Sequence, residues 1–237
     1  MHTEFLDYKD DIVMEAFVAC EEGGAAKRPA VLVSHAWAGQ GDFEREKAKK
    51  LAALGYVGIA IDLYGKGKRG SSMEENAKLM QPFMDDRALL KRRITAALNF
   101  AKGHKAVDTS RIGAIGFCFG GLCVLDLARS GAEGVKGVVS FHGLFAPPEL
   151  GKQGKITSKV LILHGFDDPM ATPDQMVGIA NEMTAAGADW QIHAYGNTGH
   201  AFTNPEMHMP EAGLFYEAKA DARSFEAMKD FLAEALA

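Results

Sequence analysis

The chain has 237 residues, of which 47% are hydrophobic and 24% charged, and its formal net charge is −5. These values are typical of a globular protein with a full hydrophobic core, and they argue against a disordered chain. The mild charge and the lack of a basic stripe argue against nucleic acid or an anionic membrane as a partner. We therefore expect a single domain over residues 1–237.

The expected elements alternate between strands and helices along the chain. In the first half we expect a strand at 12–19, a strand at 30–34, a helix at 43–54, a strand at 56–63, a loop at 65–72 and helices at 74–81 and 85–102. In the second half we expect a strand at 111–116, a helix at 122–129, strands at 135–141 and 159–163, a helix at 174–186, a strand at 191–195 and a helix at 213–236. Apolar strands alternating with helices indicate an α/β fold with a mostly parallel central sheet and helices on both faces.

The three cysteines, Cys20, Cys118 and Cys123, have neither the number for complete pairing nor the spacing of a zinc site. Reduced thiols are typical of a cytoplasmic protein.

The first residues are acidic and lack an apolar core, and no apolar run approaches the length of a membrane span, so we expect neither a signal peptide nor a membrane partner. Glycine-rich nucleotide motifs are missing as well, so we expect no cofactor and no metal.

The run G-F-C-F-G-G at 116–121 joins an expected strand to an expected helix. It has the pattern G-x-C-x-G, in which a sharp strand-to-helix turn exposes a nucleophile above the sheet. The flanking glycines are required because the turn leaves no room for side chains. The positive end of the helix stabilises a thiolate placed there, which makes Cys118 the predicted nucleophile.

A nucleophilic cysteine needs a base, and the base needs an orienting acid. His200 follows the expected strand at 191–195, and Asp168 follows the expected strand at 159–163. The chain order of nucleophile, acid and histidine is that of α/β-hydrolases. Asp167 is an alternative acid, but its spacing from Gly165 is less suitable than that of Asp168.

Five segments together resemble the dienelactone hydrolase family of α/β-hydrolases, and the resemblance covers nearly the whole chain. They are S-H-A-W-A-G at 34–39, I-D-L-Y-G at 61–65, G-F-C-F-G-G at 116–121, H-G-F-D-D-P at 164–169 and G-H-A-F at 199–202. The resemblance implies an α/β-hydrolase fold and hydrolysis of carboxylic esters or lactones through a covalent acyl-enzyme.

The same resemblance implies a role for each site residue. Cys118 would be the nucleophile, His200 the general base and acid, and Asp168 the orienting carboxylate. The oxyanion hole would consist of the backbone N–H groups of Trp37 and Phe119, since such donors stabilise the charge that develops on the carbonyl oxygen.

Two departures from the family pattern affect the expected substrate. Ala36 occupies the position of a family glutamate that governs ionisation of the cysteine, so we expect activation by histidine alone. The family's carboxylate-binding arginines have no counterpart at 71–78 or near Asn204. We therefore expect a small neutral ester or lactone as substrate, with phosphotriesters as promiscuous substrates because their tetrahedral phosphorus resembles the ester intermediate.

Several apolar residues near the expected strand ends are candidates to line the substrate pocket. They are Ala36, Met73, Phe83, His142, Phe145 and Phe202. His35 and His164 are expected to form structural hydrogen bonds.

An alternative function is a redox-responsive or ligand-binding protein with a reactive thiol, although sensing does not require the acid and the histidine. The sequence is compatible with a monomer or a homodimer.

Overall fold

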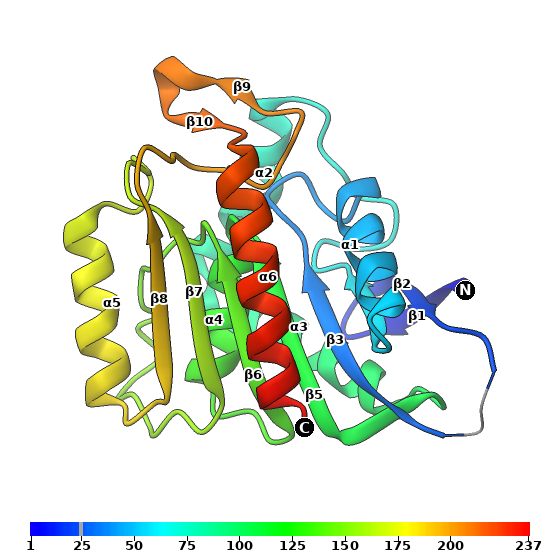
Figure 1. Ribbon diagram of the computed structural model, residues 1–237. Helices are drawn as coiled ribbons and strands as arrows, with labels where there is room; N and C mark the ends of the chain where they lie inside the picture. Colours follow the sequence, from blue (N-terminus) through cyan, green and yellow to red (C-terminus); the bar gives the residue numbers. More distant parts are fainter. Residues whose placement is uncertain (24–25) are drawn as a thin grey trace.

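Residues 1–23 and 26–237, which the computed structural model describes, fold around an eight-stranded sheet (Figure 1). Its strand order is β1-β2-β4-β3-β5-β6-β7-β8. The strands are β1 (His2–Lys9), β2 (Val13–Cys20), β3 (Arg28–Ser34), β4 (Val57–Ile61), β5 (Val107–Phe117), β6 (Val135–Phe141), β7 (Lys159–Gly165) and β8 (Trp190–Tyr195). β1 and β2 form an antiparallel hairpin at one edge, and the other strands are parallel to one another. The expected α/β-hydrolase fold with a mostly parallel sheet is confirmed.

Helices cover both faces of the sheet, as Figure 1 shows. They are α1 (Asp42–Ala53), α2 (Met73–Asp85), α3 (Arg87–Gly103), α4 (Phe119–Arg129), α5 (Pro173–Ala185) and α6 (Ala218–Ala235). α1 and α6 pack on one face, and α3, α4 and α5 pack on the other. Alternate residues of β3 serve the two cores, since Val31 and Val33 face α1 and α6 while Leu32 faces the opposite helices. This burial on both faces explains why the strands are apolar throughout.

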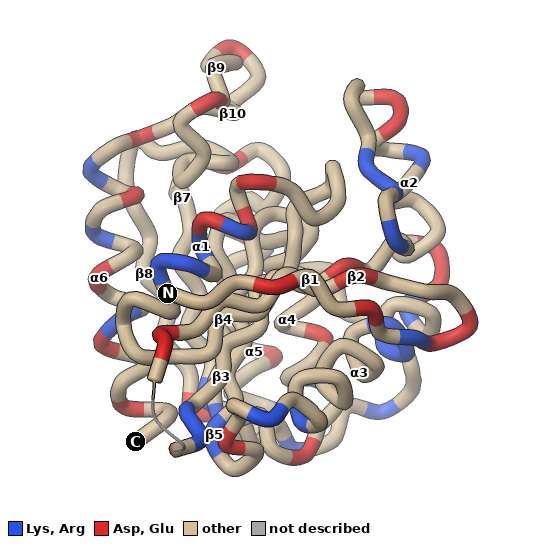
Figure 2. Tube along the Cα trace, turned by 90° about the vertical axis from the view of Figure 1, so that its right-hand side faces the viewer, with Lys and Arg blue, Asp and Glu red and all other residues tan. Residues whose placement is uncertain are grey.

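The surface carries both signs of charge. Figure 2 shows Lys and Arg interspersed with Asp and Glu over α2, α3 and the β1–β2 hairpin. Many of these side chains form local ion pairs, such as Lys78 with Glu74 at 2.6 Å. Among the described residues, no helix has the length and apolar character that crossing a membrane would require.

Two helix boundaries differ from the sequence expectation. α2 continues through Pro82 to Asp85, because the Asp86 N–H donates to the Pro82 carbonyl at 3.0 Å and Phe83 is buried as an anchor. The expected helix at 213–236 begins only at Ala218. Residues before it form β10 (Leu214–Phe215), which pairs with β9 (His208–Met209), and a short 3-10 helix, η1 (Pro210–Ala212), connects the two.

The turn from β5 into α4 depends on two close backbone approaches. A Cβ atom on Gly116 would lie 2.0 Å from the Gly120 carbonyl oxygen, and one on Gly120 would lie 2.2 Å from the Ser34 carbonyl oxygen. Both obstacles are backbone atoms, which cannot rotate away. The glycines of the G-x-C-x-G pattern therefore allow α4 to start against the end of β3.

Replacing Gly120 by alanine should lower the free energy of unfolding by at least about 3 kcal/mol, because the new methyl group would displace the β3 backbone. Chemical denaturation monitored by circular dichroism measures this. Gly178→Ala is the matched control, since Gly178 lies on exposed α5 with nothing within 4 Å of the new Cβ. That change should stabilise the protein by about 0.5–1 kcal/mol through helix propensity. Equal stabilities of the two variants would contradict this account of the turn.

Candidate active site

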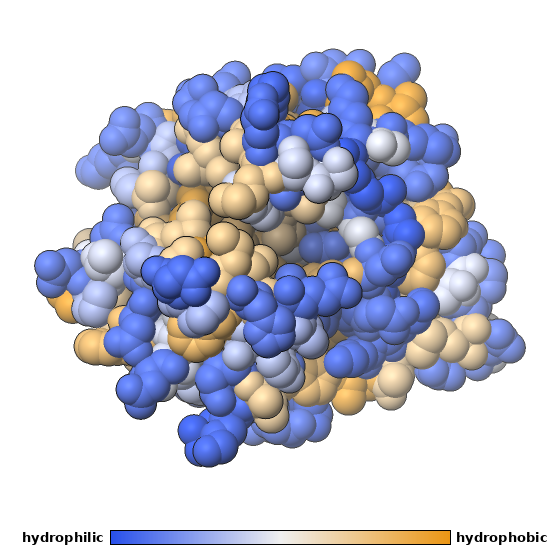
Figure 3. Space-filling view, turned by 90° about the horizontal axis from the view of Figure 1, so that it is seen from above, coloured by the Kyte–Doolittle hydropathy of each residue, from blue (hydrophilic) through white to orange (hydrophobic). Residues whose placement is uncertain are grey.

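Four functional side chains follow four neighbouring parallel strands. Cys118 follows β5, His142 follows β6, Asp168 comes after β7, and His200 comes after β8. Because the carboxyl ends of parallel strands meet at one edge of a sheet, these residues gather there. Seen from above this edge, the surface has a central hollow with weakly hydrophobic residues at its rim and hydrophilic residues around it (Figure 3).

Cys118 has a strained backbone conformation, with φ 56° and ψ −117°. This left-handed conformation is rare for a residue with a side chain, and it places the sulfur at the start of α4. The turn is held by hydrogen bonds on both sides. The Cys118 N–H faces the Phe141 carbonyl at 3.0 Å and Nδ1 of His142 at 3.2 Å, and the Gly121 N–H donates to the Cys118 carbonyl at 2.9 Å.

His142 binds the backbone of Cys118, and its two hydrogen bonds fix the tautomer of its ring. Its Nδ1 accepts from the Cys118 N–H, so its proton lies on Nε2 and is donated to Oγ1 of Thr203 at 2.9 Å. Burial, together with the charge of His200, lowers the pKa of His142 well below its usual value, which keeps the ring neutral. With both ring nitrogens engaged and the ring buried, His142 has no free polar atom for a substrate. We expected His142 to line the substrate pocket, but the ring is buried against the Cys118 backbone and Thr203.

His200 and Asp168 form a buried pair. Nδ1 of His200 lies 2.8 Å from Oδ2 of Asp168, and the other carboxylate oxygen accepts the Met170 N–H at 2.8 Å. Both side chains are about 1% exposed, whereas Asp167 is exposed. The structure thus brings Asp168, rather than Asp167, to the histidine.

The protonation of His200 is decided by competing effects. Burial disfavours the charged imidazolium, but the negative charge of the Cys118 sulfur and the bond to Asp168 favour it more strongly. Together they raise the pKa of His200 to about 10. The buried Nε2 of His200 has no hydrogen-bond partner in the described part of the chain, which leaves it available to the sulfur and to a substrate.

The loop after β3 lies beside the start of α4, where Gly120 contacts the Ser34 and His35 carbonyls. The backbone N–H groups of Trp37 and Phe119 donate no hydrogen bond within residues 1–23 and 26–237. Free N–H groups on two adjoining segments are what an oxyanion hole requires. The Trp37 carbonyl is held by the Tyr64 hydroxyl, which donates to it at 3.0 Å.

The remaining candidate pocket residues fall into different environments. Met73, at the start of α2, is 61% exposed, and Ala36 is half-buried. Phe83 and Phe145 are buried with small exposed fractions. Phe202 is fully buried, and its ring packs edge-on against His142 at 5.2 Å between centroids. The structure therefore places Phe202 behind the histidines rather than at the surface of a pocket.

Thr203 and Glu44 also lie at the site, although no motif in the sequence marks either residue. Thr203 is the partner of His142, and its place three residues after His200 was the only available signal. The Glu44 carboxylate reaches back from α1 to the loop after β3, accepting the N–H groups of Ala36 at 3.2 Å and Gly41 at 2.8 Å. His164, expected to be structural, bonds the Ala171 carbonyl through Nε2 at 2.7 Å.

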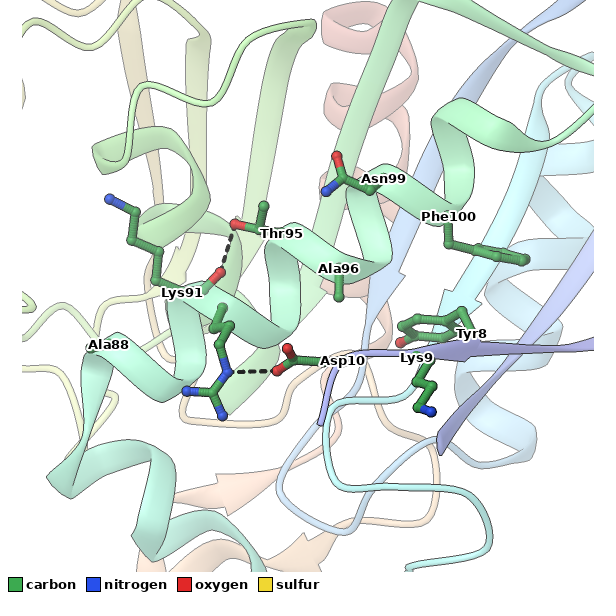
Figure 4. A pocket seen from close by; sticks show the side chains of 10 residues that line it. Tyr8, Lys9, Asp10, Ala88, Lys91, Thr95, Ala96, Asn99 and Phe100 are labelled. Carbon is green, nitrogen blue, oxygen red and sulfur yellow. Dashed lines mark hydrogen bonds and ion pairs between the residues drawn. The ribbon is translucent and has the colours of Figure 1, made fainter. Parts of the chain in front are cut away.

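Across residues 1–23 and 26–237, no three His, Cys, Asp or Glu side chains converge in a way that could bind a metal ion. A groove of about 640 Å³ lies between the end of β1 and α3 (Figure 4). Its lining includes none of the candidate residues described above. Arg92 and Asp10 pair there at 2.7 Å, and the rings of Tyr8 and Phe100 stack at 5.1 Å, so its polar and aromatic groups already contact each other.

Comparisons with known proteins agree on one family. The family model described as "Dienelactone hydrolase family" matches residues 14–236. A carboxymethylenebutenolidase of Pseudomonas putida is 27% identical over 221 residues, which are 89% of each chain. An uncharacterised protein of Caenorhabditis elegans is 37% identical over 155 residues, covering 65% of this chain and 98% of that protein.

A solved structure is similar over the entire chain. It is the crystal structure of a dienelactone hydrolase-like promiscuous phosphotriesterase from metagenomic libraries, with a TM-score of 0.94 and 35% identity. The match covers 100% of this chain and 99% of that protein. With its elbow cysteine, its sheet order and its match to the family model over residues 14–236, this chain belongs to the dienelactone hydrolase family and is a hydrolase.

Proposed function

We propose that this protein hydrolyses small neutral carboxylic esters or lactones through a Cys118–His200–Asp168 triad. The observation that carries the proposal is the strained Cys118 turn beside the buried His200–Asp168 pair. Three residues far apart in the sequence have the chain order, burial and bonding that nucleophilic catalysis needs.

In the acylation half-reaction, the Cys118 thiolate attacks the carbonyl carbon and a carbon–sulfur bond forms. The π electrons move to the carbonyl oxygen, which the N–H groups of Trp37 and Phe119 stabilise as an oxyanion. When the tetrahedral intermediate collapses, the bond to the alkoxide breaks. The proton on Nε2 of His200 passes to that alkoxide, so an alcohol leaves and a thioester remains on Cys118.

In the deacylation half-reaction, His200 is neutral and accepts a proton from water. The hydroxide attacks the thioester carbon, and the same oxyanion donors stabilise the second intermediate. Its collapse breaks the carbon–sulfur bond, releases the acid and restores the thiolate beside a protonated His200. Asp168 keeps the ring oriented throughout and stabilises the charge that it carries in the resting state.

The substrate class follows from charge and polarity. Ala36 contributes no carboxylate, and the stretches at 71–78 and around Asn204 contain no arginine to bind an anionic substrate. Arg69, which precedes the first stretch, donates instead to the amide oxygen of Gln40 at 2.9 Å. Exposed Met73 and Met170 add apolar surface near the strand ends. These features support a neutral substrate with an apolar acyl group.

Phosphotriesters are a second substrate class for the same site. The solved structure with a TM-score of 0.94 is of a promiscuous phosphotriesterase, and it shares 35% identity with this chain. A phosphotriester is also neutral, and attack at phosphorus develops negative charge on the phosphoryl oxygen, where the same two N–H groups would stabilise it.

The catalytic proposal requires a reduced Cys118, which is favoured by the cytoplasmic location that we propose. The three cysteines form no disulfide among the described residues. All the proposed catalytic groups come from one chain, so residues 1–237 would act as one domain in a monomer or a homodimer. Cys123 is fully buried, and burial raises the pKa of its thiol well above the usual value, which argues against a resolving thiol and hence against redox sensing.

Mass spectrometry after mixing with p-nitrophenyl butyrate tests the triad. Wild type should release nitrophenol in many turnovers. Cys118→Ala should carry no acyl group and lose at least about 1000-fold in kcat. His200→Ala should accumulate the butyryl group on Cys118, because the thioester lacks a base for its hydrolysis. Cys20→Ala, which removes a half-buried thiol of β2, is the matched control with unchanged turnover. Full activity in Cys118→Ala would rule out the mechanism.

The charge state of the pair makes a second prediction. With a pKa of about 10, His200 should remain protonated at pH 8 and lose its proton as the pH rises through 10. Nitrogen NMR of labelled histidine side chains measures this midpoint. Cys118→Ala removes the negative sulfur, so its midpoint should fall to a lower pH, while Asp167→Asn should leave the midpoint unchanged because that carboxylate is exposed. An equal midpoint in wild type and Cys118→Ala would contradict the ion pair.

A further inference from the structure

The peptide unit between Ala36 and Trp37 is bound on its carbonyl side by a buried histidine. Nδ1 of His35 donates to the Ala36 carbonyl oxygen at 2.7 Å. The tautomer is fixed, because Nε2 of the same ring accepts the Leu63 N–H at 3.1 Å. The ring is 0% exposed and packs edge-on against Tyr64 at 4.5 Å, so its orientation is fixed by contacts on several sides.

A buried carboxylate binds the other side of Ala36. Oε1 of Glu44 accepts the Ala36 N–H at 3.2 Å, and Oε2 accepts the Gly41 N–H at 2.8 Å. Glu44 is 3% exposed, although it lies in the first turn of an otherwise amphipathic surface helix. Burying a carboxylate is costly unless it is fully hydrogen-bonded, and here both oxygens serve the loop that carries Trp37.

These contacts determine the direction of one catalytic donor. A trans peptide is planar, so the Ala36 carbonyl and the Trp37 N–H belong to one rigid unit and point in opposite directions. The Gly39 N–H also donates to this carbonyl at 3.2 Å, and the shorter bond from His35, at 2.7 Å, comes from a buried side chain. Holding the carbonyl through His35 therefore helps to aim the Trp37 N–H. A hydrogen bond accepted by the carbonyl also polarises the amide and makes its N–H a stronger donor. Glu44 fixes the preceding N–H, so the unit cannot rotate as a whole.

We propose that His35 and Glu44 are positioning residues of the oxyanion hole, which act on the Trp37 N–H through the Ala36 peptide. This inference rests on the proposed function, in which Cys118 attacks and Trp37 stabilises the oxyanion. It gives His35 and Glu44 a catalytic consequence beyond structural hydrogen bonding.

Two reactions of the Cys118 thiol distinguish an effect on the direction of the Trp37 N–H from an effect on the fold. Turnover of p-nitrophenyl butyrate develops an oxyanion, whereas alkylation of Cys118 by iodoacetamide does not, because sulfur displaces iodide directly at a methylene carbon. In His35→Gln, kcat for the ester should fall about tenfold or more, while the alkylation rate stays within about twofold of wild type. KM should change little, since the donor acts mainly in the transition state.

Glu44→Gln provides an independent variant at the preceding peptide, whose N–H is that of Ala36. The amide keeps the size of the side chain but offers only one acceptor oxygen for two N–H groups, so it should show the same split between the two reactions. His104→Gln is the matched control. This buried histidine at the end of α3 contacts Glu4 of β1, and its replacement should leave both reactions unchanged.

The outcomes distinguish three situations. Slower ester turnover with normal alkylation in both variants supports the proposal. Equal slowing of ester turnover and alkylation overturns the proposal, because His35 and Glu44 would then affect only the fold. No change in either reaction also overturns it, because the two residues would then not affect the oxyanion hole. Failure of the proposed function would instead appear as full ester turnover in Cys118→Ala, whatever the result with the His35 and Glu44 variants.

Discussion

The close contact between the start of α4 and the end of β3 is the constraint on which the whole site depends. Because Gly120 has no side chain, its backbone lies against the Ser34 and His35 carbonyls. That approach brings the Cys118 turn next to the loop that carries Trp37, so the proposed nucleophile and the proposed oxyanion donors lie on two segments fixed to each other. The strain at Cys118 persists because surrounding backbone hydrogen bonds hold it on both sides.

Electrostatics then divides the buried histidines into different roles. His142 and His200 lie 5.1 Å apart between ring centroids, yet their pKa values are shifted in opposite directions. His142 accepts a backbone N–H and faces no carboxylate, so burial keeps it neutral. His200 has Asp168 on one side and the thiol sulfur on the other, which outweighs burial. A neutral His142 ring thus holds the backbone of Cys118, while the neighbouring His200 ring is the one whose pKa is raised.

The sheet and the sharp turn at Cys118 could be predicted from the sequence because each has a local signal, and so could the positions of Asp168 and His200 after their strands. Apolar runs mark β3 to β7, glycine spacing marks the Cys118 turn, and chain order marks Asp168 and His200. The sequence could not predict contacts that depend on the path of a loop in three dimensions. Glu44 lies three residues after the N-cap of α1, a position that is compatible with capping the helix but gives no sign of the second bond to the Ala36 N–H. Thr203 follows a turn after His200 whose direction no periodicity encodes. The strand at Leu214–Phe215 is similarly set by tertiary pairing, since His200 exchanges backbone hydrogen bonds with Gly213 and Phe215.

The loop after β3 also shows how this chain manages without an acidic residue at position 36. A carboxylate is still present beside that loop, but Glu44 contributes it from α1, and both of its oxygens accept backbone N–H groups. A carboxylate bonded in this way holds the loop through its backbone. In the proposed mechanism, His200 and, through it, Asp168 then stabilise the charge on the Cys118 sulfur. Because Ala36 is uncharged and the Glu44 carboxylate is bound to backbone N–H groups, the proposed neutral substrate suits this loop better than an anionic one would.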